Sequence, residues 1–551
     1  MSRRVLALAL AVAALYLLFL GRHGLHESDE GRYAEIAREM KESGDLLIPT
    51  LNGVPHFQKP PVIYWSTAVS LAVLGENEGA ARMVSLLAAL GVLVLTYWIG
   101  RWWFDSTTGL AAAWILAGSW QFFMLGRSLT PDMMMTFWAT AAIAGFVWAS
   151  RSEVATSARF LPYFTCMGIA FATKGPMGIL VPLLTGLGWQ WGSRTSDRTR
   201  VRIPWIAGLT LTLVLALGWF IAASLRHPEL GRYFFEFELV NRFLSKTHGR
   251  SQPIWYFIPI LLVGWLPWTP LIPLAISGNR ERRRRGVRDR AIDWALVGWL
   301  VVPLVLLSLS GSKLMTYVLP LFPGIALWLA NGLLPRGKSR ALSISVAVQM
   351  VLLVGLTLTV GVLLARGSLL PPTVELDDWF LPLLGLAVAC VVGAGWFLSR
   401  GVTESRLAGV TLSALLVWMT LASQLVHLGP VMRMQASMRP VAERLREEPD
   451  WETAQIIIAH TRAHGLKFYL GRLTDATLDK SDVVLEPTSE IAERIHPSIE
   501  ELRIRDDGRT ATYLVTRERE LKRLEQREWT VIAQEGAFML LRREAGNLQQ
   551  Y

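Results

Sequence analysis

The sequence contains few cysteines and few charged residues. Only two of its 551 residues are cysteine, Cys166 and Cys390, and both lie in apolar segments, so they cannot form the disulfide framework of a small secreted domain. Charged residues make up 18% of the chain, against about 25% in ordinary globular proteins. This shortage, together with 52% hydrophobic residues, excludes a soluble enzyme, a collagen-like chain and an intrinsically disordered chain.

Several common motifs are also missing. The chain has no glycine-rich loop ending in GK[ST], so the sequence gives no support for ATP hydrolysis. No set of cysteines and histidines has the spacing of a zinc site. The first apolar segment, 5–21, runs into Gly21-Arg22-His23-Gly24, which offers no small-x-small cleavage site. We therefore expect this segment to be an uncleaved membrane anchor and not a secretory signal.

The chain is rich in apolar segments of membrane-spanning length. Runs of roughly 17 to 24 residues can cross the hydrocarbon core of a bilayer, which is about 30 Å thick. We expect about thirteen spans, at 5–21, 81–103, 108–125, 132–150, 160–173, 175–191, 204–223, 254–276, 292–309, 314–334, 342–365, 379–399 and 407–427. The sequence thus predicts a polytopic α-helical membrane protein.

Arginine is concentrated in the short loops between these segments. Four basic clusters lie at 194–202, 280–290, 336–340 and 400–406. With thirteen spans and a cytoplasmic N-terminus, all four fall on one side, which the positive-inside rule makes cytoplasmic. The net charge of +11 is then a consequence of membrane orientation, and no nucleic-acid partner is expected.

Three longer polar segments fall on the opposite side: loops at about 22–80 and 224–253, and a tail from 428 to 551. The tail alternates β-like runs with helical stretches, so we expect a transmembrane domain over 1–427 and a small α/β domain outside the cytoplasm over 428–551. The β-like runs include 456–458, 467–470, 512–515 and 538–541. The short aromatic segment 62–74 is expected to lie along the membrane interface; if it spans instead, the arginine sidedness is lost.

Ionisable residues gather on this non-cytoplasmic face. They are costly in or near a bilayer, so we treat them as functional candidates. The candidates are Asp29, Glu30, Arg32, Tyr33, His56, Lys59, Asp132, Lys174, Arg242, His248, Arg250, Lys313 and Tyr317. Cations outnumber carboxylates among them, which suits a phosphate or pyrophosphate ligand held by bidentate arginine and point-charge lysine.

Some residues of the first polar loop also have structural interpretations. Asp29 stands at the start of a helical stretch, 30–41, where a carboxylate can serve as a helix cap. The sequence therefore leaves two roles open for Asp29, that of a catalytic residue and that of a helix cap. Arg32 with Glu35, or Arg38 with Glu42, has the spacing of an ion pair on a helix surface, and for Glu35 and Arg38 this is the interpretation that we favour.

A series of motifs follows the same face along the chain. Segment 28–40 reads Ser-Asp-Glu-Gly-Arg-Tyr-Ala-Glu-Ile-Ala-Arg-Glu-Met. Later motifs are Phe57-Gln58-Lys59-Pro60, Thr130-Pro131-Asp132, Thr173-Lys174-Gly175-Pro176, Asn241-Arg242-Phe243, His248-Gly249-Arg250 and Ser312-Lys313 through Tyr317. In this order they resemble bacterial 4-amino-4-deoxy-L-arabinose lipid A transferases and, more broadly, the protein O-mannosyltransferase-like superfamily of polyprenyl-phosphate-dependent glycosyltransferases.

The resemblance implies a GT-C fold with thirteen spans, juxtamembrane helices in the first periplasmic loop and a C-terminal periplasmic domain. It implies inverting transfer of a sugar from undecaprenyl phosphate to lipid A or a related cell-envelope acceptor at the bacterial inner membrane. By position, Asp29 is the principal catalytic carboxylate, and Asp132 is the second acidic residue and the candidate ligand of a divalent metal that the sequence does not require. The residues implied around the donor phosphate are Arg32, Tyr33, Lys59, Lys174, Arg242 and Tyr317. Further candidates are Glu30, His56, His248, Arg250 and Lys313.

The chain departs from this family pattern at one place. The arabinose transferases usually have Tyr-Phe-Glu-Lys-Pro where this sequence has His56-Phe57-Gln58-Lys59-Pro60. The lost carboxylate would have suited an amino sugar, so another sugar, or another acceptor such as protein Ser/Thr or a glycan, remains an alternative. A transporter or flippase of lipid-linked sugars is a further alternative, but it predicts charges at mid-membrane depth and related halves, which the sequence lacks.

Overall fold

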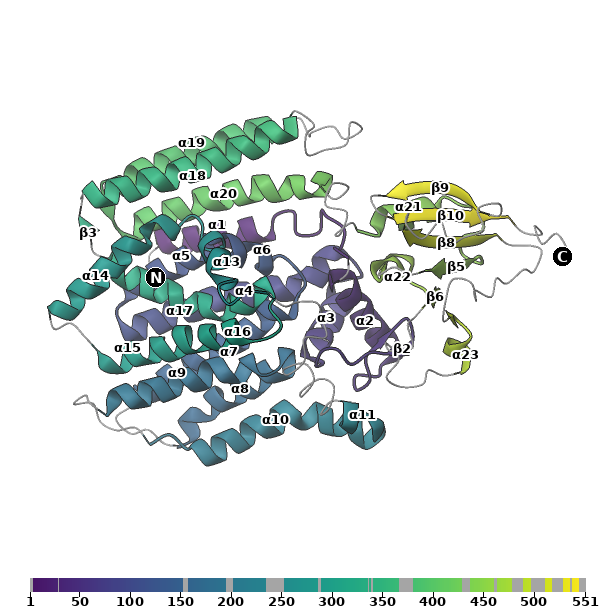
Figure 1. Ribbon diagram of the computed structural model, residues 1–551, viewed down its shortest axis with the longest axis horizontal. Helices are drawn as coiled ribbons and strands as arrows, with labels where there is room; N and C mark the ends of the chain where they lie inside the picture. The colour runs from purple at the N-terminus through teal and green to yellow at the C-terminus, as the bar shows by residue number, and fades with distance from the viewer. Residues whose placement is uncertain are drawn as a thin grey trace.

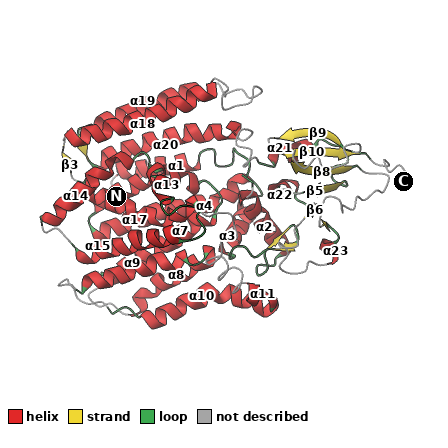
Figure 2. Cartoon of the chain, in the orientation of Figure 1, coloured by secondary structure: helices red, strands yellow, loops and turns green. Residues whose placement is uncertain are grey.

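The computed structural model combines a large helical bundle with a small β-rich unit at one end of it (Figures 1 and 2). It describes residues 3–27, 29–151, 157–194, 202–233, 252–285, 289–334, 336–337, 340–365, 380–428, 437–459, 463–477, 489–496, 511–517, 529–535 and 538–544. Helices α2 (Asp29–Ser43) and α3 (Val62–Leu74), with the short strands β1 (Thr50–Leu51) and β2 (Val54–Pro55), lie between the bundle and the β-rich unit.

The bundle is built from helices of very different lengths. Its described helices are α1 (Arg3–Leu17), α4 (Glu78–Trp103), α5 (Ser106–Ala117), α6 (Trp120–Gly126), α7 (Pro131–Ser150), α8 (Leu161–Lys174), α9 (Met177–Ser193), α10 (Trp205–Arg226), α11 (Glu229–Arg232), α13 (Phe257–Gly264), α14 (Ile272–Arg284), α15 (Arg290–Leu296), α16 (Val302–Leu309), α17 (Phe322–Leu333), α18 (Arg340–Ala365), α19 (Phe380–Ser399) and α20 (Glu404–Leu428). A 3₁₀ segment, η5 (Met315–Leu321), leads into α17.

Five of the described helical segments are long and apolar enough to cross a membrane, or up to seven if each of two bent pairs forms one span. The pair α5 and α6 bends by 72°, and α13 bends by 100° relative to the segment Thr269–Arg284. The expected spans 108–125 and 254–276 are therefore not straight helices. Proline explains the second bend, because Pro267, Pro270 and Pro273 each lack a backbone N–H. The expected number of about thirteen spans stays a prediction.

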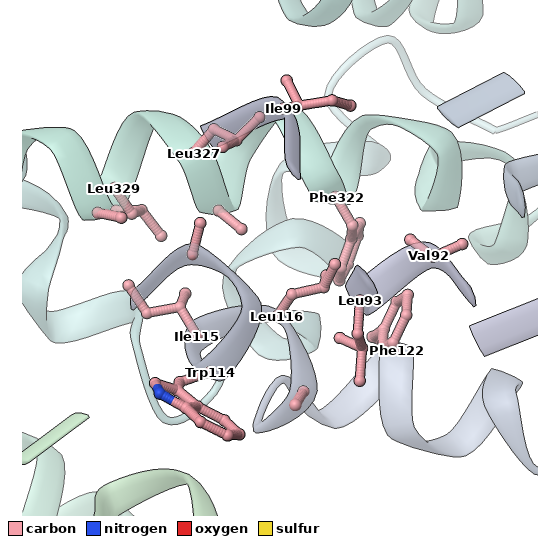
Figure 3. Close-up of a cluster of buried hydrophobic side chains, with 14 of the residues drawn as sticks. Val92, Leu93, Ile99, Trp114, Ile115, Leu116, Phe122, Phe322, Leu327 and Leu329 are labelled. Carbon is pink, nitrogen blue, oxygen red and sulfur yellow. The ribbon is translucent and has the colours of Figure 1, made fainter. Parts of the chain in front are cut away.

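The bundle core lies where α4, α5, α6 and α17 meet (Figure 3). The buried side chains drawn there include Val92, Leu93, Ile99, Trp114, Ile115, Leu116, Phe122, Phe322, Leu327 and Leu329. Glycines let two of these helices approach closely: a Cβ on Gly100 of α4 would lie 2.6 Å from the Cα of Gly109 on α5. Small residues at such a crossing allow the backbone-to-backbone packing that is typical of membrane helices.

Helix α2 is polar in sequence yet largely buried. Ten of its fifteen residues are buried, including several charged ones. Of the two pairs expected on a helix surface, Arg38–Glu42 forms, with 2.6 Å between Nη1 and Oε1, whereas Arg32 pairs with Asp29 instead of Glu35. Arg38 also binds Glu35, with Nε–Oε2 and Nη2–Oε1 distances of 2.8 and 2.9 Å, and the side chains of Glu35 and Arg38 are only 0% and 1% exposed. The surface assignment was wrong because another helix of the chain, α22 (Gly465–Leu470), packs against α2.

The β-rich unit is a six-stranded mixed sheet in the order β7-β6-β5-β8-β10-β9. Its described elements are α21 (Arg439–Arg446), β5 (Gln455–Ile458), α22, β6 (Asp475–Thr477), α23 (Ser489–Ala492), β7 (Ile495–His496), β8 (Thr512–Arg517), β9 (Thr530–Glu535) and β10 (Phe538–Arg543). Strand β5 runs parallel to β6 and β8, and β10 runs antiparallel to β8 and β9. The run 467–470, expected to be β-like, is instead part of helix α22. We refer to residues 437–544 as the C-terminal unit.

The bundle has two chemically different ends. The end of α14, with Arg282, Arg283 and Arg284 in its last turn, and the strand pair β3 (Arg336–Gly337) and β4 (Gly401–Val402) lie at the end away from α2 and the C-terminal unit (Figure 1). The candidate residues of the first polar loop lie at the opposite end, on α2 and the loop after it. This arrangement separates the basic loops from the candidate site by the length of the bundle.

Candidate functional site

Arg32 organises the first part of the site. Asp29 is the first residue of α2, and its side chain is 63% exposed. Arg32, one helical turn later, donates from Nη2 to Asp29 Oδ1 at 2.7 Å and from Nη1 to Gln58 Oε1 at 2.9 Å. The planar guanidinium can serve both partners because its donors point in fixed directions. It therefore ties the start of α2 to the loop that carries residues 56–60.

The backbone carbonyl of His26 accepts hydrogen bonds from backbone N–H groups at the start of α2. The Glu30 and Gly31 N–H groups donate to that carbonyl at 3.1 and 3.3 Å. The Asp29 carboxylate is instead turned to Arg32. The capping alternative for Asp29 is therefore not favoured, and its exposed carboxylate is available for chemistry.

Tyr33 links Asp29 to the second acidic candidate. The Arg32 guanidinium carbon lies 5.2 Å from the centre of the Tyr33 ring, and the Tyr33 and Tyr64 ring centres are 6.0 Å apart. Burial raises the pKa of Tyr33 to about 12; Arg32 opposes this rise, and the charges of Asp29 and Asp132 add to it. Tyr33 is thus a protonated hydroxyl within electrostatic reach of both carboxylates.

His56 and Lys59 lie beside Arg32 in the following loop. Burial, with the positive charges of Arg32, Lys59 and Lys467, lowers the pKa of His56 to about 3, so its imidazole is neutral near pH 7. Phe57 is 3% exposed and its ring centre lies 6.3 Å from that of Trp219 on α10. This apolar contact anchors the loop to the bundle between two polar candidates.

The second part of the site joins three elements of the bundle. Asp132 lies in the first turn of α7 and is 3% exposed, and it forms an ion pair with Lys174, the last residue of α8. The Lys174 ammonium lies 5.1 Å from the ring centre of Tyr317, which belongs to η5. Residues 132, 174 and 317, far apart in the sequence, are therefore neighbours. We call the set Asp29, Arg32, Tyr33, His56, Lys59, Asp132, Lys174 and Tyr317 the α2–α7 site.

Glu30 is not part of this set. Its carboxylate pairs with Arg82 of α4 at 2.7 Å, and both side chains are 4% exposed. It also accepts the N–H of Leu129 at 2.7 Å and that of His26 at 3.0 Å. Burial alone would raise the pKa of Glu30, but Arg82 lowers it to about 2. Glu30 therefore fastens α2 to the bundle, and the signal in the sequence was Arg82, an arginine inside an expected span.

The remaining candidates lie elsewhere or outside the described residues. Lys313 is 6% exposed and donates to the backbone carbonyls of Ser310 at 2.6 Å and Gln252 at 2.9 Å. Its ammonium group therefore connects two segments of the backbone. Arg242, His248 and Arg250 fall in 234–251, outside the ranges that the structure describes.

The donor set around Asp132 does not fit a metal site. Its carboxylate is engaged by Lys174, a cation that competes with a metal ion for the same oxygens. Within the described ranges, no group of three or more His, Cys, Asp and Glu side chains could hold a metal ion. We therefore derive no chemical step through a metal.

The charges of the α2–α7 site favour an anionic ligand. Each of its two carboxylates already has a cation beside it, Arg32 or Lys174, and Lys59 adds a further positive charge. Tyr33 adds a protonated hydroxyl. Donors of this kind suit a phosphate oxygen, and the exposed Asp29 carboxylate stands next to them.

Two proteins of known name that are similar to this chain share one name with one another. A family model described as dolichyl-phosphate-mannose-protein mannosyltransferase matches residues 1–234. An undecaprenyl phosphate-alpha-4-amino-4-deoxy-L-arabinose arabinosyl transferase of Pectobacterium carotovorum is 31% identical over 403 residues, which cover 72% of this chain and 70% of that protein. The protein of the same name from Yersinia enterocolitica is 32% identical over 354 residues, and the match spans 62% of each chain.

Solved structures show the same fold over nearly the whole chain. ArnT from Cupriavidus metallidurans bound to undecaprenyl phosphate has a TM-score of 0.79 and 23% identity, and the match covers 99% of both chains. The apo structure of that protein has a TM-score of 0.78 and 22% identity, with 98% and 97% covered. The fold is therefore that of a GT-C multi-pass membrane protein.

Proposed function

The chain belongs to the family of undecaprenyl phosphate-alpha-4-amino-4-deoxy-L-arabinose arabinosyl transferases, and from this membership we propose that it is an inverting glycosyltransferase. It takes a sugar from undecaprenyl phosphate and transfers it to lipid A or a related cell-envelope acceptor. The observation that carries this proposal is the α2–α7 site, in which Arg32 holds the exposed carboxylate of Asp29, Lys174 pairs with Asp132, and Lys59 lies close enough to His56 to act on its charge.

The cations act on the leaving group. When the acceptor attacks the anomeric carbon, the bond from that carbon to the phosphate oxygen breaks, and the phosphate diester leaves as a monoester. Negative charge grows on its oxygens in the transition state, where preorganised donors stabilise it most. Arg32, Lys59 and Lys174 supply charge there, and the hydroxyls of Tyr33 and Tyr317 supply neutral donors.

Asp29 acts on the acceptor side. If the acceptor is a hydroxyl, Asp29 is the general base that takes its proton. If the acceptor is a phosphate, it is already ionised near neutral pH, and Asp29 then orients it or stabilises positive charge on the sugar ring. In either case an exposed carboxylate held by Arg32 at 2.7 Å is suited to the role.

The reaction takes place at the periplasmic face of the inner membrane. The arginine-rich ends of α14 and β3 support this orientation, since they lie at the opposite end of the bundle from α2 and the positive-inside rule assigns them to the cytoplasm. We propose about thirteen spans, a cytoplasmic N-terminus, a membrane domain over 1–427 and a periplasmic domain over 428–551.

Gln58 favours a variant of this function. It accepts a bond from Arg32 through a neutral amide, at the position where the family resemblance expects a carboxylate. A sugar without an ammonium group, or an acceptor other than lipid A, would not require that carboxylate. The reaction type is the same for either sugar.

The test is a transfer assay with defined lipids. Purified protein in detergent is incubated with undecaprenyl-phosphate-linked aminoarabinose or a neutral pentose, together with lipid A, and mass spectrometry identifies the mass added to the acceptor. Asp29→Asn should reduce transfer at least 100-fold while binding of undecaprenyl phosphate survives. Glu443→Gln, which also changes a carboxylate to an amide, at a residue 57% exposed on α21, is the matched control. Near-normal transfer by Asp29→Asn would refute its chemical role.

A further inference from the structure

The C-terminal unit touches α2 within its first turn, two residues after Asp29. Gly31 of α2 and Gly465 at the start of α22 face each other: a Cβ on Gly31 would lie 2.7 Å from the nitrogen and 2.8 Å from the Cα of Gly465. Such distances leave no room for a side chain, so glycine at both positions permits this approach. Arg32 follows Gly31 directly, so the contact lies next to the site.

A buried carboxyl group closes this contact. Glu27 is 4% exposed, and it accepts the backbone N–H of His464 at 3.1 Å and that of Gly465 at 2.5 Å. Burial raises the pKa of Glu27 to about 8, although these two hydrogen bonds oppose the rise. The side chain lies only two residues before Asp29, and it joins the chain entering α2 to a segment more than 430 positions later.

Other contacts hold the same unit through residues that are farther from Asp29 in the sequence. The Asn52 amide donates to the carbonyl of Thr474 at 2.7 Å and accepts the N–H of the same residue at 3.0 Å. The Tyr469 hydroxyl accepts the N–H of Leu25 at 2.7 Å and donates to Glu78 at 3.2 Å. The unit is thus attached at several points, and among these hydrogen bonds of the described residues those of Glu27 lie nearest in sequence to Asp29.

On the basis of the proposed sugar transfer, we propose that Glu27 is a positioning residue. It clamps the first turn of α2 to the C-terminal unit and so keeps Asp29 and Arg32 in their working geometry. The C-terminal unit then takes part in catalysis without contributing a group to the α2–α7 site. Without this contact we expect Asp29 to lose its position. Lys59 and Lys174 should then provide most of the binding of the sugar donor's phosphate.

The test compares Glu27→Gln with two control variants of the full-length chain in detergent. A glutamine keeps the shape but presents an NH₂ group where one of the two N–H donors needs an acceptor. Asn52→Ala removes another attachment of the same unit, and Glu443→Gln alters a carboxylate that is 57% exposed on α21. Hydrogen exchange of residues 30–36 and of strand β8 is measured by mass spectrometry, along with kcat and the KM for the donor.

We expect exchange of residues 30–36 to be at least tenfold faster in Glu27→Gln, with exchange in β8 unchanged. The kcat should fall at least tenfold while the KM stays within threefold, and both controls should retain wild-type exchange in 30–36. Gly465→Ala should reproduce the Glu27→Gln result, because its Cβ would lie 2.4 Å from Glu27 Oε1.

Two outcomes would overturn the proposal. Wild-type exchange and kcat in Glu27→Gln would show that the clamp does not matter, and faster exchange in β8 as well would show that Glu27 supports the whole unit rather than the turn. If the wild-type chain transfers no sugar at all, the proposed function fails, and the exchange comparison still decides whether Glu27 fixes the start of α2.

Discussion

At the scale of single residues, the α2 part of the site depends on the guanidinium of Arg32. It holds the carboxylate of Asp29 and the amide of Gln58 at the same time, with donor–acceptor distances of 2.7 and 2.9 Å. A lysine carries the same charge but has no rigid fork of donors. We therefore expect the geometry of the Arg32 guanidinium, and not only its charge, to be required for sugar transfer.

Replacing Arg32 with lysine should lower kcat/KM for sugar transfer about 100-fold. Loss of one preorganised donor to a developing oxyanion typically costs about 2.7–4 kcal/mol, or roughly 10²–10³ in rate. The measurement is the rate of transfer at several donor concentrations. Arg444→Lys, at an arginine 40% exposed on α21, should be indistinguishable from wild type. Equal activity of the two variants would show that the fork of Arg32 is not used.

Gln58→Glu should change the choice of sugar. The new carboxylate would lie beside Arg32 at the site surface and could also meet an ammonium on the sugar. An exposed ion pair is worth up to about 1 kcal/mol, so the preference for an aminoarabinose donor over a neutral pentose donor should rise about fivefold in a competition assay. An unchanged preference would mean that Gln58 does not face the sugar. Gln534→Glu in β9 is the control.

His56 should make the protein less stable in mild acid. Its folded pKa of about 3 lies below the usual value of about 6.5, so the unfolded chain binds the proton more readily between these two pH values. Stability is then greatest above about pH 6.5 and falls as the pH drops towards 3. Between pH 6.5 and 5 the loss should be about 1–2 kcal/mol. Thermal unfolding of wild type and His56→Gln at these two pH values measures it, and equal shifts would contradict it.

At the scale of elements, one buried ion pair joins α2 to the bundle. Arg82 of α4 pairs with Glu30 and also donates to the carbonyls of Leu20, His23 and Gly24. The chain leaving α1 and the start of α2 therefore meet at one guanidinium. Asp29 and Arg32 of the α2–α7 site lie in the same helical turn as Glu30, so their positions depend on this ion pair.

Glu30→Gln should destabilise the protein by about 3–5 kcal/mol, because it leaves the charge of Arg82 buried without its partner. Denaturant or thermal unfolding in detergent measures the change. Glu443→Gln on α21, which removes one partner of an ion pair whose side chains are 43% and 57% exposed, should change stability by less than about 1 kcal/mol. A small effect of Glu30→Gln would show that Arg82 is solvated or paired in another way.

At the scale of the whole molecule, the charge distribution defines two ends. Arginine-rich turns gather at one end of the bundle, and the α2–α7 site with the C-terminal unit lies at the other (Figure 1). Under the positive-inside rule this asymmetry predicts the orientation of the chain in a bilayer. In the orientation that we propose, the site lies on the side where a lipid-linked sugar and an outer-leaflet acceptor can meet.

Cysteine labelling tests this orientation. In a background where Cys166 and Cys390 are replaced by alanine, Glu443→Cys should react with a membrane-impermeant maleimide added to spheroplasts. Arg283→Cys, at a side chain 54% exposed near the end of α14, should react only after the membrane is permeabilised. Labelling in the reverse order would invert the proposed topology.

The sequence by itself determined the features that depend on local pattern. Apolar runs identified a membrane protein, because a bilayer requires stretches of a set length. The helical stretch 30–41 lies within α2, and the run 456–458 lies within β5, because side-chain periodicity is local. The candidate residues were found from their charge and their place along the chain.

Tertiary structure decided what those residues touch. The pairing of Asp132 with Lys174, the burial of Glu35 and Arg38, and the partnership of Glu30 with Arg82 all join or cover segments that are distant in sequence. The run 467–470 has strand-like residues but forms a helix because it packs on α2. Burial and charge pairing depend on which surfaces come into contact in the folded chain. The local sequence pattern does not contain that information.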